Sequence, residues 1–205
     1  QLAEEAYMFG YPLVLMEKSR EKLTNFPSAG EIGAPMNQLS KSRKFPDYTF
    51  TDVVSPNADT LYSQGYVDLS KEPYILSMPD MGDRYYLMQI LNGWTDVFAS
   101  PGTRTEGGKA QNYALVGPFW EGKLPDNVKE IKSPTNLIWI IGRTATTGTP
   151  DDYAKVHKLQ DQYKLTPLSA WGTNYEVPKE VPINKELDMK KSPDDVQGPP
   201  VAASA

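Results

Sequence analysis

Short apolar runs separated by proline and glycine limit what this sequence can fold into. Proline and glycine make up 33 of the 205 residues, where average usage would give about 12%. Because both residues interrupt regular structure, the elements between them must be short, which argues against a helix bundle. Hydrophobic residues at 39% and charged residues at 23% are ordinary for a globular protein and too apolar for a disordered chain.

Five runs rich in aromatic, β-branched and leucine residues predict β-strands. They cover residues 60–69, 74–78, 85–94, 113–116 and 137–144. Turn residues separate them and no helical pattern intervenes, so the sequence favours an antiparallel β-sandwich or jelly roll. Nearly every residue of 85–91 is apolar or aromatic. This is typical of a strand that is covered on both faces, or of one that is packed on one face and lines an aromatic cleft with the other.

Helical patterns flank these strands. In residues 2–24 apolar side chains recur on one helix face, and Gly10 and Pro12 predict a kink or two abutting helices. Residues 151–165 begin with two acids and repeat apolar residues every three or four positions. The expected fold class is therefore mainly β (α+β), with an N-terminal helix and one helix after the last core strand.

The proline distribution predicts the domain organisation. We expect residues 1–172 to form a single β-rich domain, and residues 173–205 to form a proline-rich arm or linker toward a second domain. Five prolines interrupt that last segment and its apolar residues are sparse, so it should lack a core of its own. The irregular stretch 26–55 is long for a compact domain, and such loops often carry function or wrap a neighbouring subunit.

Charge and residue inventory exclude several classes of function. Lys+Arg 21 against Asp+Glu 26 give a net charge of −5, so no nucleic-acid partner is expected. No apolar run approaches the roughly 20 residues of a membrane span. With no cysteine and only His157, thiol chemistry and histidine-rich metal sites are excluded, and we expect no metal and no cofactor. His157 is predicted to be a surface or boundary residue rather than a catalytic base.

The glycine-rich segment 102–110 imitates a phosphate-binding loop. Its spacing is wrong by one residue, and Ala110 stands where such a loop needs a magnesium-binding Ser or Thr, so nucleotide binding is rejected. Arg104 in this segment has two interpretations. It is either a surface charge or a guanidinium that binds a carboxylate or another anion.

The turn 55–62, with the sequence SPNADTLY, is the most distinctive stretch. Proline fixes its entry, and Asn57 and Asp59 can accept backbone N–H bonds, so a rigid structural turn is one interpretation. The other is that the turn presents Asn57, Asp59 and Tyr62 to a ligand in a cleft.

Arg143 ends the most apolar strand of the sequence. It either pairs with Asp59 or Asp68 at the sheet margin or binds an anionic ligand. The predicted ligand-binding residues are therefore Asn57, Asp59, Tyr62, Trp94, Arg104 and Arg143.

Several motifs together resemble a known family. They are GYPL at 10–13, PMNQ at 35–38, VSPNADTLYS at 54–63, DLSKEP at 68–73, WIIGRT at 139–144 and LQ at 159–160. Through them residues 5–171 resemble the domain-of-unknown-function family 1254 (DUF1254), for which PNADTLY is a specific motif. The resemblance implies a jelly-roll-like, oligomeric bacterial protein, exported in many members, which a second β-rich domain commonly follows. It implies no catalytic residues. We therefore expect a periplasmic or secreted protein and a homo-oligomer, with a cytoplasmic location as the alternative.

Three functions remain open from the sequence. The first is a ligand-binding or assembly module of an exported protein, recognising a small polar or glycan-like ligand, because 22 aromatic residues beside Asn, Asp and Arg suit such ligands. The second is a hydrolase or lyase that uses carboxylate acid/base chemistry, with Asp59 paired with Asp68 or Glu72 as catalytic candidates. The third is a purely structural oligomer subunit.

Overall fold

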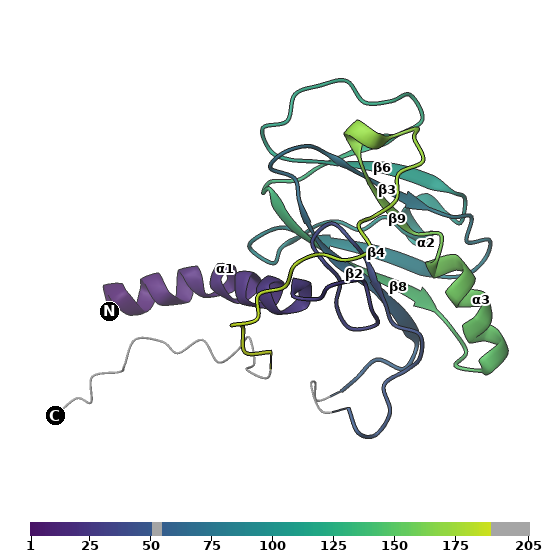
Figure 1. Ribbon diagram of the computed structural model, residues 1–205, viewed down its shortest axis with the longest axis horizontal. Helices are drawn as coiled ribbons and strands as arrows, with labels where there is room; N and C mark the ends of the chain where they lie inside the picture. The colour runs from purple at the N-terminus through teal and green to yellow at the C-terminus, as the bar shows by residue number, and fades with distance from the viewer. Residues whose placement is uncertain (51–54, 190–205) are drawn as a thin grey trace.

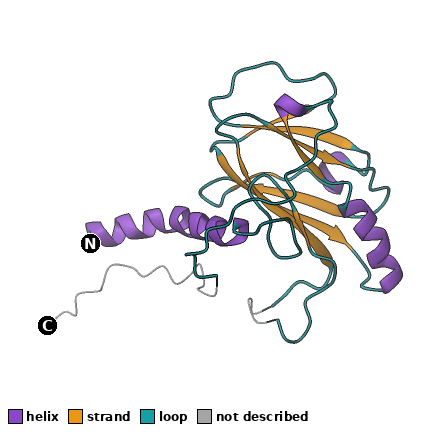
Figure 2. Cartoon of the chain, in the orientation of Figure 1, coloured by secondary structure: helices purple, strands orange, loops and turns teal. Residues whose placement is uncertain are grey.

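The computed structural model describes residues 1–50 and 55–189 (Figure 1). Two β-sheets form its centre, and the helices lie at their margins (Figure 2). The predicted fold class is confirmed: the chain is mainly β, with a helix at its N-terminus and another after the last long strand.

The first sheet is antiparallel throughout and has the strand order β1-β2-β8-β4-β5. Its strands are β1 (Ser40–Lys41), β2 (Thr60–Asp68), β4 (Tyr86–Leu91), β5 (Val97–Ala99) and β8 (Leu137–Ala145). The second sheet has the order β7-β6-β3-β9, and only its β6–β7 pair is parallel. Its strands are β3 (Tyr74–Met78), β6 (Gln111–Val116), β7 (Lys129–Lys132) and β9 (Lys164–Pro167).

The main core lies between the two sheets, because side chains alternate along each strand. On β8, Ile138 and Ile140 are fully buried in this core, whereas Trp139 and Ile141 pack in a separate cluster on the outer face. Both sheets contribute to the core, with Val67, Met88, Ile90, Ile138 and Ile140 from the first and Leu76, Met78, Tyr113, Leu115 and Leu165 from the second. This shared burial of apolar side chains holds the two layers together.

The outer face of the first sheet is covered mainly at one end. There the helix α1 (Leu2–Thr24) packs Met16 and Leu23 into a cluster with Tyr66 and Trp139, whose rings stack at 5.2 Å. At the other end the face is more open, since the side chain of Val97 is 49% exposed. A part of this sheet is therefore accessible to a ligand.

Two helix predictions need correction. The helix α1 is one helix through Pro12, so the predicted alternative of two abutting helices is wrong. Proline removes one backbone hydrogen bond of the helix, and the helix continues on both sides of it. The helix α3 (Pro150–Gln160) ends five residues before the predicted boundary, because Tyr163 and Leu165 are buried between the sheets and the chain there enters β9.

The remaining short elements are α2 (Thr103–Glu106) and the 3-10 turn η1 (Leu168–Ala170). None of the helices in the described ranges is long and apolar enough to cross a membrane.

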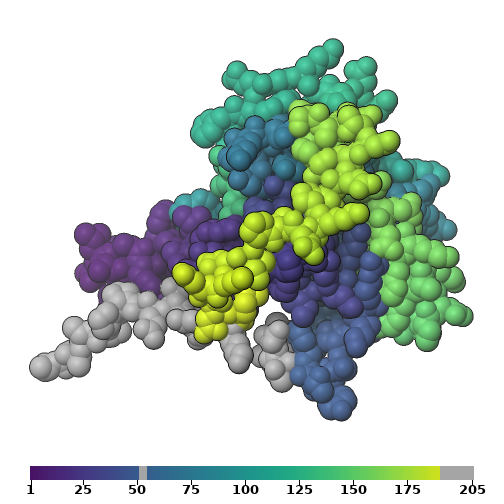
Figure 3. All heavy atoms as spheres, viewed as in Figure 1, coloured from purple at the N-terminus to yellow at the C-terminus, as the bar shows by residue number. Residues whose placement is uncertain are grey.

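Residues 173–189 contain no helix or strand and run back across the body to α1 (Figure 3). Asn25 at the end of α1 and Asn184 exchange two hydrogen bonds of 2.9 and 2.7 Å. Val181 donates a third hydrogen bond to the Pro27 carbonyl oxygen at 2.8 Å. The rest of the predicted arm, 190–205, lies outside the described residues.

Candidate ligand-binding site

A pocket of about 330 Å³ opens on the less covered end of the first sheet. Outward-facing residues of β4 and β5 form one part of it, and the segment that carries α2 forms the other. We call it the Arg104 pocket, and its lining residues are Tyr85, Tyr86, Leu87, Gln89, Val97, Ser100, Gly102, Arg104 and Thr105.

Glycine at position 102 allows this arrangement. The segment around Gly102 lies directly against β4, where Gly102 and Leu87 form a β-bridge. A Cβ atom at this position would fall 2.6 Å from the Tyr86 carbonyl oxygen and 3.0 Å from the Leu87 Cα atom, so a side chain would push the segment away. The Tyr86 N–H donates to Thr103 Oγ1 at 3.0 Å, which fixes the start of α2 at the pocket rim.

Arg104 extends from α2 above the ring of Tyr85. Its Cζ atom lies 6.0 Å from the ring centroid, and Tyr85 is 38% exposed. Within the described ranges Arg104 forms no ion pair, whereas the neighbouring Glu106 pairs with Lys129 at 2.5 Å. The guanidinium therefore keeps its donors for a ligand, and the tyrosine ring supports it through a cation–π contact.

Arg143 lies on β8, the strand next to β4, and Tyr62 lies on β2, the strand after that. Both side chains are on the same face of the sheet as Leu87 of β4. They are direct cross-strand partners, and Arg143 in turn stands opposite Leu87. The Arg143 Nη1 atom donates to Tyr62 Oη at 2.8 Å, and its Cζ atom lies 4.8 Å from the tyrosine ring. The ion pair predicted between Arg143 and Asp59 or Asp68 is not found among the described residues. The pleat instead places a tyrosine opposite the arginine.

Asn57 stabilises its own turn. Its Oδ1 atom accepts hydrogen bonds from the backbone N–H groups of Asp59 and Thr60, and its Nδ2 atom donates to Thr60. These bonds within the turn support the first of the two interpretations, a rigid structural turn. Asp59 is exposed, and its carbonyl oxygen accepts a hydrogen bond from the Thr146 N–H at 3.1 Å.

The other predicted residues lie elsewhere. Trp94 follows β4 and packs its ring against Phe9 of α1 at 5.3 Å. The Asp68 carboxylate accepts the Ser70 N–H at 2.9 Å, and Glu72 accepts from the backbone and hydroxyl of Ser169. The two carboxylates thus accept local hydrogen bonds, and none of these three residues lines the Arg104 pocket.

The structure thus places Arg104 in the pocket, puts Tyr62 and Arg143 on the same face, and separates Asn57, Asp59, Asp68 and Trp94 from it. Sequence reasoning missed Tyr85, Leu87, Gln89 and Val97 as lining residues. The aromatic character of 85–91, read as a strand that could line a cleft, was the available indication for the first three.

Metal ligands do not gather in the described part of the chain, where no three His, Cys, Asp or Glu side chains could hold an ion together. The single histidine is half-buried, and its Nε2 atom lies 2.6 Å from the Arg43 carbonyl oxygen. His157 lies within α3 at the boundary between buried and exposed residues, as the sequence predicted.

The family described as "Protein of unknown function (DUF1254)" matches residues 36–167, well over half of the chain. The chain belongs to the DUF1254 family. The matched region contains both sheets, the Arg104 pocket and α3, and begins after α1.

Solved structures resemble this DUF1254 chain. The VPA0106 protein from Vibrio parahaemolyticus is 28% identical with a TM-score of 0.66, and the match covers 93% of this chain and 43% of that one. An uncharacterised protein from Burkholderia cenocepacia is 10% identical with a TM-score of 0.41, covering 64% of this chain and 34% of that one. The DUF1254 chain therefore spans less than half the length of the Vibrio protein that it matches. No curated protein matches the chain.

Proposed function

We propose that this DUF1254 chain is a binding module for a small ligand that combines an anionic group with an apolar body. The observation that supports it is Arg104, which stands over the Tyr85 ring at the rim of a 330 Å³ pocket and forms no ion pair within the described residues. A guanidinium in this position can donate two parallel hydrogen bonds to a carboxylate.

The pocket's composition favours a ligand with an apolar part over a fully hydroxylated sugar. Leu87, Val97 and the ring of Tyr85 offer apolar surface, and Gln89 offers one amide. Small-molecule sites commonly combine such apolar surface with a few placed polar groups and have volumes of about 300–1,000 Å³. Among the polar or glycan-like ligands expected from the sequence, a carboxylate with a hydrocarbon body fits best.

The geometry supports catalysis by Asp59 and Asp68 less well than it supports ligand binding at the Arg104 pocket. Asp59 immediately precedes β2 and Asp68 ends it. A strand of this length spans about 30 Å, so the two carboxylates are too far apart to act on one bond. Binding without chemistry is therefore the function that we propose.

The expectations on cellular context are also part of the proposal. We propose that the module works in an exported protein and is joined to a second β-rich domain. The length of the Vibrio protein, more than twice the part matched here, supports the second domain.

Benzoate is a suitable probe, because it joins one carboxylate to one apolar ring. Isothermal titration should show binding of benzoate, and Arg104→Met should weaken it by about tenfold to a hundredfold, the effect of losing charge-assisted hydrogen bonds. Lys109→Met is the matched control, since Lys109 is an exposed cation near α2 outside the pocket. Equal affinities for benzoate and neutral benzamide, or equal affinities of Arg104→Met and wild type, would rule out the proposed recognition.

A further inference from the structure

A second groove lies at the margin where an edge strand of each sheet lines the same pocket. The strand β1 is an edge of the first sheet, and β9 is an edge of the second. Lys41 of β1 and Lys164 of β9 both line this pocket, which has a volume of about 420 Å³. A pocket of about 340 Å³ adjoins it and shares Ala29, Leu39 and Lys41 with it. The two pockets therefore form one groove, which we call the Lys41 groove.

The segment 173–189, which crosses the body in Figure 3, forms one wall of this groove. Val177 and Lys179 of this segment line the larger pocket. Gln38, which lines the same pocket, donates its side-chain N–H to the Pro178 carbonyl oxygen at 3.2 Å. The groove is thus built by parts of the chain that lie far apart in the sequence.

Lys41 is the mostly buried charge of the groove. Side chains two residues apart in an extended chain point to the same side, and Leu39 is buried in the core between the sheets. The Lys41 side chain is accordingly only 21% exposed. Buried lysines are normally paired closely, yet the Asp161 carboxylate lies 3.9 Å from the Lys41 Nζ atom. Within the part of the chain that the structure describes, the Lys41 ammonium donates no hydrogen bond.

The Asp161 carboxylate is already paired with a different cation. Arg43 Nη2 donates to Asp161 Oδ1 at 2.5 Å, and Asp161 is 58% exposed. Burial lowers the pKa of Lys41, Asp161 opposes this only in part, and the nearby charges of Arg43 and Lys164 lower the pKa further. The groove therefore holds a positive charge that its nearest carboxylate does not balance.

Two further acids line the groove without pairing with Lys41. Glu31 accepts the backbone N–H of Arg43 at 3.3 Å, and Glu176 is an exposed residue of the segment 173–189. Neither forms an ion pair within the described residues. The Lys41 ammonium is thus left to an anion from outside the chain.

We infer that the Lys41 groove binds a phosphate group. Ammonium groups are compact point charges, and several of them can surround the oxygens of one phosphate. A phosphate would give Lys41 the close partner that it lacks, and Lys164 and Lys179 line the same pocket. Val177 is 43% exposed and offers apolar surface to the body of a phosphate ester. This inference is independent of the Arg104 pocket, which shares no lining residue with the groove.

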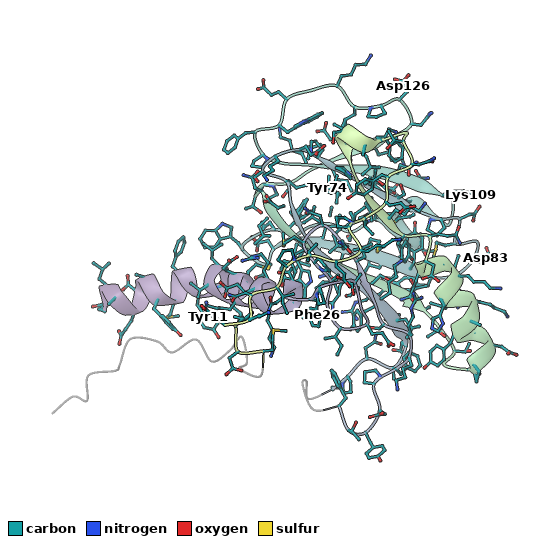
Figure 4. The ribbon with its side chains drawn as sticks, viewed as in Figure 1. Tyr11, Phe26, Tyr74, Asp83, Lys109 and Asp126 are labelled. Carbon is teal, nitrogen blue, oxygen red and sulfur yellow. The ribbon has the colours of Figure 1, made fainter. Side chains whose placement is uncertain are left out.

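Isothermal titration of the full chain with inorganic phosphate and with phenyl phosphate, at constant ionic strength, tests the site. Lys41→Met should weaken the binding of both probes at least tenfold, because charge-assisted hydrogen bonds are lost. Lys164→Gln, a change at an exposed residue, should weaken it severalfold. Lys109→Gln is the control, since this exposed lysine, labelled in Figure 4, lines neither pocket of the groove. Tighter binding of phenyl phosphate would assign the groove to a phosphate ester, and equal affinities would assign it to the free ion.

Melting temperatures separate a binding role of Lys41 from a structural one. Lys41→Met removes a mostly buried charge without a close partner, so the melting temperature without phosphate should stay the same or rise. Phosphate should raise the melting temperature of wild type and of Arg104→Met alike, and should leave that of Lys41→Met unchanged.

Three results would overturn the inference. A lower melting temperature of unbound Lys41→Met would make Lys41 a structural partner of Asp161. Loss of phosphate binding in Arg104→Met would place the ion in the Arg104 pocket. Equal phosphate affinities of wild type and Lys41→Met, including no binding by either, would leave the groove without this ligand.

Discussion

Replacing Asp152 by Asn should lower the free energy of unfolding by about 3 kcal/mol, because it leaves a mostly buried arginine without its carboxylate. The side chains of Arg84 and Asp152 are only 22% and 12% exposed and form two hydrogen bonds of 2.6 and 3.1 Å. The same carboxylate accepts from Thr146 Oγ1 at 2.9 Å and from the Thr147 N–H at 2.8 Å. Asp152 therefore joins α3 to the end of β8 and to the loop that precedes β4.

Asp151→Asn is the matched control, because Asp151 is the adjacent residue of α3 and is exposed. Urea unfolding followed by circular dichroism should show a lower midpoint for Asp152→Asn and nearly the wild-type midpoint for Asp151→Asn. Equal midpoints for the two variants would contradict the anchoring role of Asp152.

The same site predicts how stability depends on pH. The hydrogen bonds from Arg84, then those from Thr147 and Thr146, hold the pKa of Asp152 well below its usual range in the folded protein. The unfolded chain, with an Asp pKa of about 3.9, therefore takes up this proton first as the pH falls. The stabilisation is present above about pH 4 and is lost as the pH falls through the folded pKa. Wild type should lose more stability on acidification than Asp152→Asn, and parallel pH profiles would exclude this source of acid sensitivity.

Gly65→Ala should cost about 2–3 kcal/mol of unfolding free energy, near the upper range for overpacking a tight site. Gly65 lies in the middle of β2, and a Cβ atom there would overlap the Gln38 carbonyl oxygen. Backbone hydrogen bonds hold the neighbouring loop in place, since Asn37 N–H donates to the Tyr66 carbonyl oxygen at 2.8 Å. The loop cannot move aside without breaking them.

Gly93→Ala is the corresponding control. A Cβ atom at Gly93 would lie 3.5 Å from Thr135 Oγ1, an ordinary van der Waals contact, and this residue is also buried. Thermal unfolding should therefore separate the two variants clearly. If Gly65→Ala and Gly93→Ala have the same melting temperature, the close approach of the loop at Asn37 and Gln38 to β2 is not needed for stability.

The long strands were predictable because each is a continuous apolar or alternating run between turn residues. β3 occupies the predicted residues, and β2 and β8 differ from the prediction by one residue. The strands that escaped prediction, β1, β5 and β7, are short, and β7 is largely charged and exposed. Their pairing comes from neighbouring strands rather than from a local pattern. The first two residues of β9 were interpreted as the end of a helix, because Tyr163 continues the apolar spacing of α3.

The candidate site was only partly predictable, for a different reason. Arg104 could be selected by the chemistry of its side chain, but its support by Tyr85 depends on the bridge between Leu87 and Gly102, which no local pattern indicates. Asn57 has the residue type of a ligand-binding group, yet its hydrogen bonds are made within its own turn. Residue chemistry thus identifies candidates, and long-range contacts decide which of them lie in one pocket.

The most direct test of the proposed function is to observe the pocket while it fills. Methyl NMR spectra should be recorded on the full chain during a benzoate titration, with Leu87 and Val97 as reporters in the pocket and Leu165 as a reporter in the core between the sheets. We predict saturable chemical-shift changes of the Leu87 and Val97 methyl signals and an unchanged Leu165 signal. In Arg104→Met, none of these signals should shift. Saturable shifts that avoid Leu87 and Val97, or that persist in Arg104→Met, would contradict binding at the Arg104 pocket.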